Sequence, residues 1–350
     1  MPDTNLELSK IIGHEEFAKY FNQEMLAKST LIKCGVAVPD PVIAAKVAEG
    51  NGIEGSTLDM PSVDSLDNAG DASVPVEKTG VDAEGVTTTQ DKAVIQFRRK
   101  KFAVTDVQRI MRSADPMAQI VAQQTPYWDK QNQKVFLSIV KGIFAANGTK
   151  KIVDAESAES AQNGYKYGCD GDAILDLTAA QSDAAKILGK DSIMLAAQKL
   201  GDRKGDLVAV AMNSQVETFL AGLDTNAGLY RASEAAGELS KYNGRDIIVD
   251  DTIPYDEDTK TATIYLFGRG CFAFNMLPCP HQFEMQRDAD KAVDYIHAWE
   301  RFILHLRGWK WNGSAAGLAP TNQELETAGN WLRVYDKKRI PCVMLKAKLG

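Results

Sequence analysis

The sequence predicts a mixed α+β fold that contains one unusually long helix. Apolar residues recur at helical spacing from Asp115 to Ala145. Beyond residue 170, helix-like and strand-like patterns alternate as far as the closing stretch VYDKKRIPCVMLKAK. Before the long helix, an acidic segment leads into the strand-like stretch AVIQFRRKKFAVTD. Helices and strands mixed in this way indicate an α+β architecture.

Composition places the chain among soluble globular proteins and limits its partners. A length of 350 residues suffices for two domains of ordinary size. The net charge of −7 disfavours general nucleic-acid binding. No apolar run is long enough to cross a bilayer, and the first residues do not read as a secretion signal. The five cysteines are odd in number and widely scattered, which favours reduced thiols in a cytoplasm.

The N-terminal block contains an amphipathic helical stretch, EEFAKYFNQEMLAKSTLIKCG, which is predicted to end at Gly35. The sequence VPDPV follows it. Because the residue before each proline is pushed out of the helical region, extended chain is predicted here.

The segment from Glu49 to Lys92 carries ten acidic and two basic residues, a net charge of −8. No Phe, Trp or Tyr occurs from Asn22 to Gln96. Such a segment cannot bury enough apolar surface to order itself, so it is disordered or held by something outside its own fold. Its two ends, IEGSTLDM and AVIQFRRKKFAV, both read as strands, which predicts a long hairpin.

Four consecutive positive residues, Arg98, Arg99, Lys100 and Lys101, lie in the second of these strands. Neighbouring side chains of a strand point to opposite faces, so Arg99 and Lys101 share one face while Arg98 and Lys100 share the other. One interpretation is a solvated edge strand protected from aggregation. The other is a docking surface for an acidic partner, including the acidic segment of another copy.

The long helical stretch begins with Asp115, which can cap the helix, and Pro116, which fits its first position. At this length it would span about 45 Å. Its middle, DKQNQK, is polar and includes Lys130, whereas its end, VFLSIVKGIFA, is apolar nearly all round. One end is therefore expected to be buried in a domain and the other to project. Pro126 is expected to kink or break the helix.

The remaining elements follow in order along the chain. Helices are expected in DLTAAQSDAAKILGKDSIMLAAQKLGD, in SQVETFLAGL and in TNQELETAGNWL. In SQVETFLAGL, Ser214 and Glu217 have the spacing of a capping box. Strands are expected in LVAVAMN, RDIIVDDTIP, TATIYLFGRGCFAFNM, RFILHLRGWKW and VYDKKRIPCVMLKAK.

The sequence offers little that indicates catalysis. No glycine loop has nucleotide-binding spacing, and GCDGD at 168–172 is typical of a turn. Cys279 and His281 lack the paired spacing of zinc ligands. His297 and His305 are expected on a β surface beside arginines. We therefore predict no catalytic residue, no cofactor and no metal site.

The order of these parts resembles that of the major capsid proteins of tailed bacteriophages, whose fold tailed-phage and herpesvirus shells share. Four stretches in sequence carry the resemblance: AVIQFRRKKFAVTD, DPMAQIVAQQTPYWDKQNQKVFLSIVKGIFA, ERFILHLRGWKW and APTNQELETAGNWLRVYDKKRI. The resemblance implies an N-terminal arm (1–48), an extended loop (49–104), a peripheral domain with a spine helix (105–165 and 277–312) and an axial domain (166–276 and 320–350).

The resemblance also implies a function. The chain is expected to be a structural, non-enzymatic protein whose hexamers and pentamers form an icosahedral shell around double-stranded DNA, without sequence-specific contacts and without a membrane. It is expected in the virion capsid, assembled in the host cytoplasm with a separate scaffolding protein and a portal. Arg98, Arg99, Lys100, Lys101 and Lys130 are the candidate intersubunit contacts. The alternatives are an encapsulin-like shell with protein cargo and a cytosolic enzyme with a mobile acidic lid.

Overall fold

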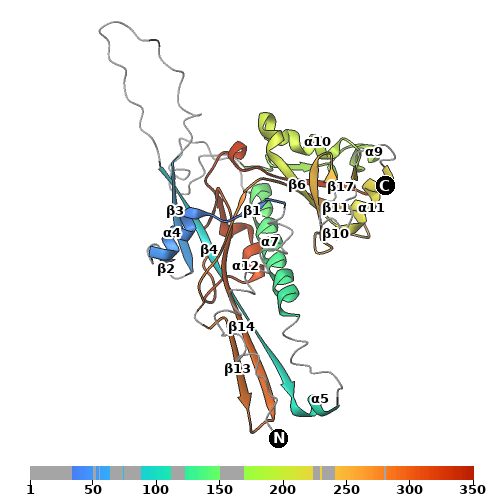
Figure 1. Cartoon of the computed structure of the whole chain (residues 1–350). Coiled ribbons are helices and arrows are strands. Elements are labelled where there is room, and N and C mark those ends of the chain that lie inside the picture. The colour runs from blue at the N-terminus through green and yellow to red at the C-terminus, as the bar shows by residue number, and fades with distance from the viewer. Residues whose placement is uncertain are drawn as a thin grey trace, which may run out of the picture.

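Two large β-sheets and one long helix dominate the described part of the chain (Figure 1). The computed structural model describes residues 34–49, 53–54, 56–63, 74, 88–111, 123–149, 169–223, 229–230, 241–279 and 281–350. Most of the expected arm and the middle of the acidic segment lie outside these residues. The expected α+β class is confirmed.

The first sheet has the strand order β1-β12-β14-β4-β3-β2, with β13 also paired to β14. Its strands are β1 (Ala37–Val38), β2 (Ile53–Glu54), β3 (Thr57–Val63), β4 (Thr88–Thr105), β12 (Phe272–Met276), β13 (Phe283–Asp288) and β14 (Val293–Leu306). Apart from the parallel pair β1–β12, the pairs in this sheet are antiparallel. The sheet narrows into a projecting finger of β13, β14 and β4, with α5 (Asp106–Met111) at its tip (Figure 1).

β4 is the longest strand and has two different partners. Its first part, Thr88 to Val94, pairs with β3, as the sequence predicted for a hairpin. Its second part, Ile95 to Thr105, pairs with β14 on the other side. Residues on either side of Ile95 therefore belong to one continuous strand that joins the acidic segment to the finger.

The second sheet has the order β5-β17-β11-β6-β9-β8-β7, with β10 paired to β11. Its strands are β5 (Ile174–Asp176), β6 (Leu207–Met212), β7 (Leu229–Tyr230), β8 (Lys241–Tyr242), β9 (Arg245–Val249), β10 (Tyr255–Asp256), β11 (Thr261–Gly268) and β17 (Cys342–Lys348). Short helices accompany it: α9 (Asp183–Lys186), α10 (Ser192–Ala197), the 3-10 helix Gln198–Asp206 and α11 (Ser214–Leu223). A small third pair, β15 (Trp309–Trp311) with β16 (Trp331–Arg333), lies near α12 (Asn322–Glu326) and the 3-10 turns Ala328–Asn330 and Lys337–Arg339. The first helix that the structure describes, α4 (Pro41–Glu49), packs on the first sheet.

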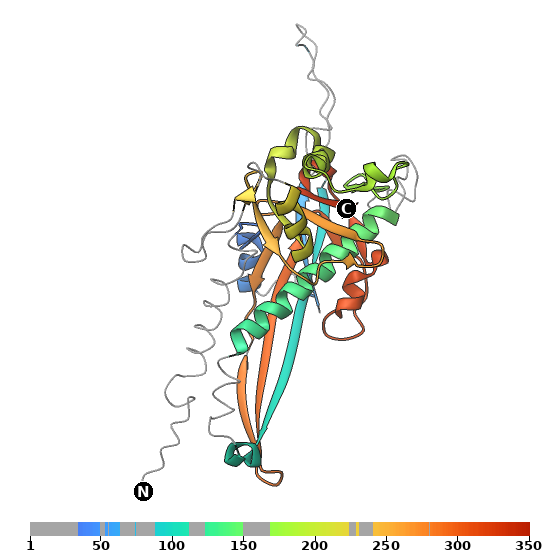
Figure 2. The ribbon, with the colours of Figure 1, turned by 90° about the vertical axis from the view of Figure 1, so that its right-hand side faces the viewer.

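The long helix α7 (Gln124–Thr149) lies between the two sheets and crosses the finger at its start (Figures 1 and 2). Phe136 on α7 contacts both sheets: its ring centroid is 4.7 Å from that of Phe272 on β12 and 5.3 Å from that of Phe267 on β11. The apolar end predicted for this helix is buried, and its side chains join one large core with residues from both sheets. Burial of this apolar area is the main force that holds the two sheets to the helix.

The structure corrects the expected course of the long helix. The helix runs to Thr149, and its predicted beginning at Asp115 lies outside the described residues. Pro126 does not kink α7, because it lies in the first turn of the described helix, where a backbone N–H has no partner inside the helix. The helix is therefore about 39 Å long from Gln124.

Two local predictions were wrong at helix starts: the extended chain predicted for VPDPV ends at Asp40, and the predicted cap of α11 is one residue off. Pro41 does not continue an extended chain but begins α4, and the Asp40 carboxylate accepts a hydrogen bond from the Val42 amide, 2.9 Å away. At α11 the cap is Asn213 rather than Ser214, because the Asn213 side chain accepts from the Gln215 amide at 3.0 Å. At both helices the cap is a side chain of the residue directly before the first helical position.

Candidate intersubunit surface

The four positive residues lie on β4, where the strand pairs with β14. Arg98 is opposite Glu300, Arg99 opposite Trp299, Lys100 opposite Ala298, and Lys101 opposite His297. The β3 pairing ends before this stretch. Among the described residues, this part of β4 is therefore a sheet edge, and its side chains alternate between two faces.

The inner face of this stretch packs against α7. Ala298 contacts Trp128 in a buried cluster, and the rings of Phe102 and Tyr127 meet edge to face at 5.5 Å. Arg98 is half-buried here, and its guanidinium donates to Gln96 Oε1 at 3.0 Å and to Asn322 Oδ1 at 3.2 Å. Arg98 therefore serves contacts within its own chain.

The outer face carries exposed cations beside aromatic rings. The Arg99 guanidinium lies 5.3 Å from the centroid of Trp299, and Lys101 Nζ lies 3.6 Å from that of Tyr295. Phe97 stacks on Trp299 with centroids 5.4 Å apart. We call Phe97, Arg99, Lys101, Tyr295 and Trp299 the cationic-aromatic face. Cation–π contacts hold the two charges in place while leaving them open to an acidic partner.

Lys130 does not join this face. It is exposed on the polar first half of α7, and α7 covers the opposite face of the finger. Of the five predicted contact residues, Arg99 and Lys101 lie together on the open face. Arg98 is half-buried and bonded within its own chain, whereas Lys100 and Lys130 are exposed elsewhere.

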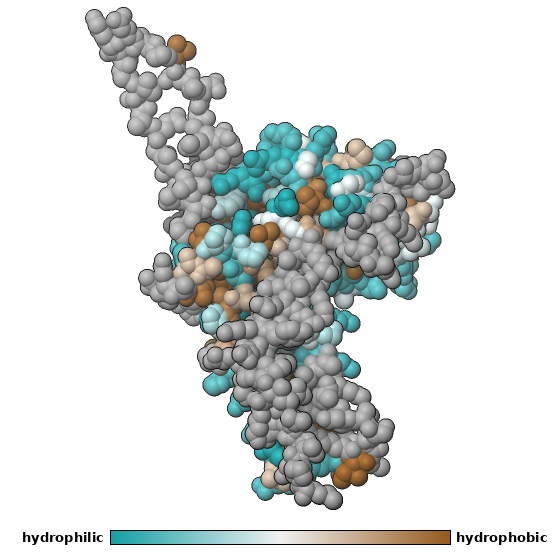
Figure 3. Space-filling model, viewed as in Figure 1, coloured by the Kyte–Doolittle hydropathy of each residue, from teal (hydrophilic) through white to brown (hydrophobic). Residues whose placement is uncertain are grey.

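The tip of the finger is a second exposed feature. Val107 and Ile110 on α5 are 62 % and 83 % exposed, and Figure 3 shows an apolar patch at this end of the molecule. The Arg287 guanidinium holds α5 against β13 and β14, with ion pairs of 2.7 Å to Asp106 and 2.9 Å to Asp294. The exposure of these apolar side chains was not predicted from the sequence.

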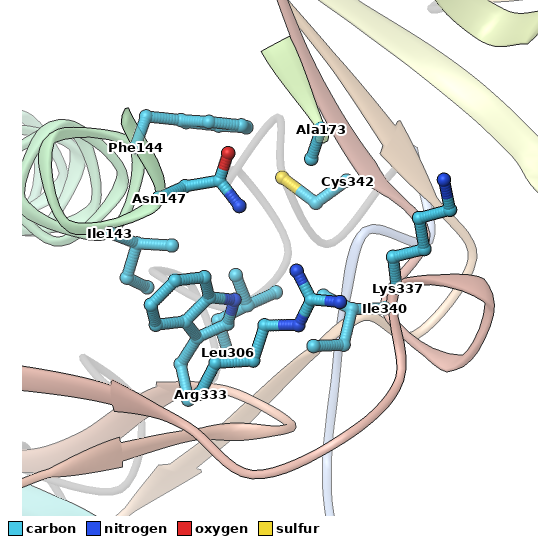
Figure 4. Close-up of a pocket in the computed structure, with 10 residues that line it drawn as sticks. Ile143, Phe144, Asn147, Ala173, Leu306, Arg333, Lys337, Ile340 and Cys342 are labelled. Atoms are coloured by element: carbon cyan, nitrogen blue, oxygen red, sulfur yellow. The ribbon is translucent and has the colours of Figure 1, made fainter. Parts of the chain in front are cut away.

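A buried polar joint fixes the far end of α7 to β16 and to Asp172, which precedes β5 of the second sheet. The Arg333 guanidinium, with its residue 2 % exposed, donates to both oxygens of Asp172 at 2.9 Å. Asn147 on α7 donates to the same carboxylate at 2.9 Å. Figure 4 shows Asn147 and Arg333 lining a small pocket together with apolar side chains such as Phe144 and Cys342. Sequence reasoning missed this joint, because its members lie far apart in the chain.

The prediction that His297 and His305 both lie on a β surface was partly wrong. His297 lies on the outer face of β14, hydrogen-bonded to Gln286 at 3.3 Å. His305 is not on a surface: it is fully buried, with Nε2 3.0 Å from Asp91 Oδ2. Within the part of the chain that the structure describes, no three His, Cys, Asp or Glu side chains gather as metal ligands. None of the described helices is long and apolar enough to span a membrane.

Comparison with known proteins identifies the family. Residues 78–344 match the family model described as Gp13-like, major capsid protein 13-like. The chain belongs to this family of major capsid proteins. It is also 28 % identical over 347 residues to the major capsid protein of Bacillus phage SPP1, covering 98 % of both chains.

Solved structures with the same fold are capsid proteins as well. The capsid of Ralstonia phage GP4 matches with a TM-score of 0.54 at 11 % identity, covering 85 % of both chains. The capsid of a native GTA particle matches with a TM-score of 0.51 at 12 % identity, covering 91 % of this chain and 90 % of that one. The resemblance stated from the sequence is therefore confirmed in both family and fold. For a major capsid protein, the surfaces to consider are those that meet further copies.

Proposed function

We propose that this major capsid protein assembles into a closed icosahedral shell of hexamers and pentamers that encloses packaged double-stranded DNA. The match to capsid proteins along nearly the whole chain carries this proposal. The net charge of −7 supports the DNA part, because a lining that bound phosphates tightly would hinder the movement of DNA during packaging. We infer a purely structural role without catalysis, in the virion capsid.

Within the subunit, we propose the four parts expected from the family: an arm (1–48), an extended loop (49–104), a peripheral domain (105–165 and 277–312) and an axial domain (166–276 and 320–350). In that arrangement, neighbouring subunits would contact the finger, the α5 helix at its tip and the cationic-aromatic face. A separate scaffolding protein and a portal would complete assembly in the host cytoplasm.

We further propose that the cationic-aromatic face meets acidic groups of a neighbouring copy, with the segment from Glu49 to Lys92 as the candidate. The charges are complementary, since that segment carries −8. A closed shell repeats each contact many times, so a weak contact in each subunit becomes strong in total.

Electron microscopy of the chain expressed with its scaffold tests the function. We expect closed particles of uniform size that take up double-stranded DNA when the packaging machinery is present. Particles that hold only cellular protein would instead indicate a nanocompartment. A stable monomer under all assembly conditions would contradict a shell-forming role.

A further inference from the structure

Glu300 occupies an unusual place between the finger and α7. It lies on β14 and is only 1 % exposed. Its Oε1 accepts a hydrogen bond from Asn132 Nδ2 on α7, 2.9 Å away. Its Oε2 is also buried and has no hydrogen-bond partner among the described residues. One neutral side chain thus provides the hydrogen bond that links this carboxyl to the long helix.

The charges around Glu300 do not compensate an ionised carboxylate. α7 contributes Asp129, which has the same sign as the carboxylate. β4 contributes Arg98, but its guanidinium donates to Gln96, Phe97 and Asn322 and forms no ion pair with Glu300. Gln96 from β4 and Asn322 from α12 are uncharged.

Burial of Glu300 favours the protonated form of its carboxyl group. Burial is the largest influence and raises the pKa of Glu300 to about 8 from an ordinary 4.5. The hydrogen bond from Asn132 lowers this pKa, Asp129 raises it, and Arg98 lowers it. Near neutral pH the side chain is therefore mainly uncharged while α7 stays packed on the finger.

We propose that Glu300 is a proton-dependent latch that holds the first half of α7 against the finger when neutral and loosens it when ionised. The geometry that carries this inference is a buried carboxyl at the junction of two elements, with one oxygen bonded across the junction and the other unpartnered. The latch is a property of the single subunit. Its consequence for a shell, a pH-dependent angle between finger and helix, rests on the proposed function.

The sign of the pH dependence follows from linkage. Local opening lets the carboxyl lose its proton at an ordinary pKa, whereas the closed junction holds the proton up to about pH 8. Opening should therefore increase by up to about tenfold per pH unit between roughly pH 5 and 8, and level off above pH 8.

Hydrogen exchange of the full chain, kept unassembled, measures this opening directly. Peptides covering 124–136 are followed from pH 5 to 9.5, and each rate is divided by the intrinsic exchange rate at that pH. We expect the wild-type profile to rise and then level off, and Glu300→Gln to give a flat profile. Glu284→Gln, which changes an exposed carboxylate on β13 of the same finger, should keep the wild-type profile.

Two further variants test the latch without altering Glu300. Asp129→Asn removes a negative charge and should move the levelling point to lower pH, whereas Arg98→Gln removes a positive charge and should move it to higher pH. Opposite shifts from two different elements are not expected of a merely structural carboxyl. The proposal is overturned if the normalised exchange rates of wild type and Glu300→Gln change with pH in the same way. It is also overturned if the pH at which the rate stops rising is unchanged in the two charge variants.

Discussion

At the scale of single residues, the buried pair of Asp91 and His305 supports the first sheet. Asp91 also accepts hydrogen bonds from the amides of Gly308 at 2.9 Å and Lys92 at 2.8 Å. Burial alone would raise the pKa of Asp91, but His305 and these amides outweigh it and hold the pKa below its ordinary value. The stability that this depressed pKa contributes is present above the unfolded-state value, near pH 3.8, and is lost as the pH falls through the folded-state value.

Replacing His305 by leucine should destabilise the subunit. The change leaves a buried carboxylate without its side-chain hydrogen-bond partner, which costs about 1–3 kcal/mol, or more for a charged group. Urea denaturation at pH 7 measures this loss. The double variant Asp91→Asn with His305→Leu should recover part of it, because the uncompensated charge is gone; a double variant as unstable as the sum of the two single changes would contradict the pairing.

At the scale of elements, the contact between α7 and α12 depends on Gly142. A Cβ placed there would lie 1.9 Å from the carbonyl oxygen of Leu325 and 2.7 Å from Trp331 Nε1. That indole N–H already donates to the same carbonyl at 2.7 Å. The absence of a side chain therefore lets α12 and its following turn lie directly on the long helix.

Gly142→Ala should destabilise the fold by about 1–3 kcal/mol or more, because it overpacks this contact. Helix propensity predicts the opposite sign, a gain approaching about 1 kcal/mol. Gly148→Ala is the matched control in the same helix, since its Cβ would meet nothing nearer than Ile174 Cδ1 at 3.4 Å. Thermal unfolding distinguishes the two, and equal midpoints for both variants would show that the contact is not tight.

Sequence patterns predicted most elements because each element leaves a local signal. The strand-like residues of TATIYLFG form β11, and the apolar stretch VFLSIVKGIFA forms the buried end of α7. What the sequence does not show is which distant residues meet. Asp91 and His305 are 214 positions apart, and they meet because β4 and β14, the strands on which they lie, are neighbours in the first sheet. The buried position of Glu300 has the same origin, because neither its strand pattern nor its type marks it as buried.

Part of the candidate site could be predicted from the sequence and part could not. Period-two alternation correctly separated the pair Arg99 and Lys101 from the pair Arg98 and Lys100. It could not say which face α7 covers, because that depends on packing between elements far apart in the chain. The structure supplies that information, and the open face is the one with Arg99 and Lys101.

At the scale of the whole molecule, the two charge pairs should differ in assembly. Neutralising Arg99 and Lys101 together, as glutamines, should weaken shells and reduce the salt dependence of assembly, because exposed charges are screened by salt. Light scattering across a salt series measures both effects. The matched variant, Arg98 and Lys100 changed to glutamine, should retain the parental salt dependence while Arg98 loses its contacts within the chain. If both double variants assemble like the parent at every salt concentration, the face has no acidic partner.

The parallel pairing of β1 with β12 has a consequence for the order of folding. Residues 37 and 38 meet 272 and 273, and Asn275 exchanges hydrogen bonds with the backbone of Asp40 across 235 positions. At about 5–20 residues per second, a ribosome makes β12 roughly 10–50 s after β1. Contacts between such distant segments also form slowly, because a long loop must close first. The first strand that the structure describes is thus among the last to be paired, and a nascent chain that ends before β12 cannot complete this edge of the sheet.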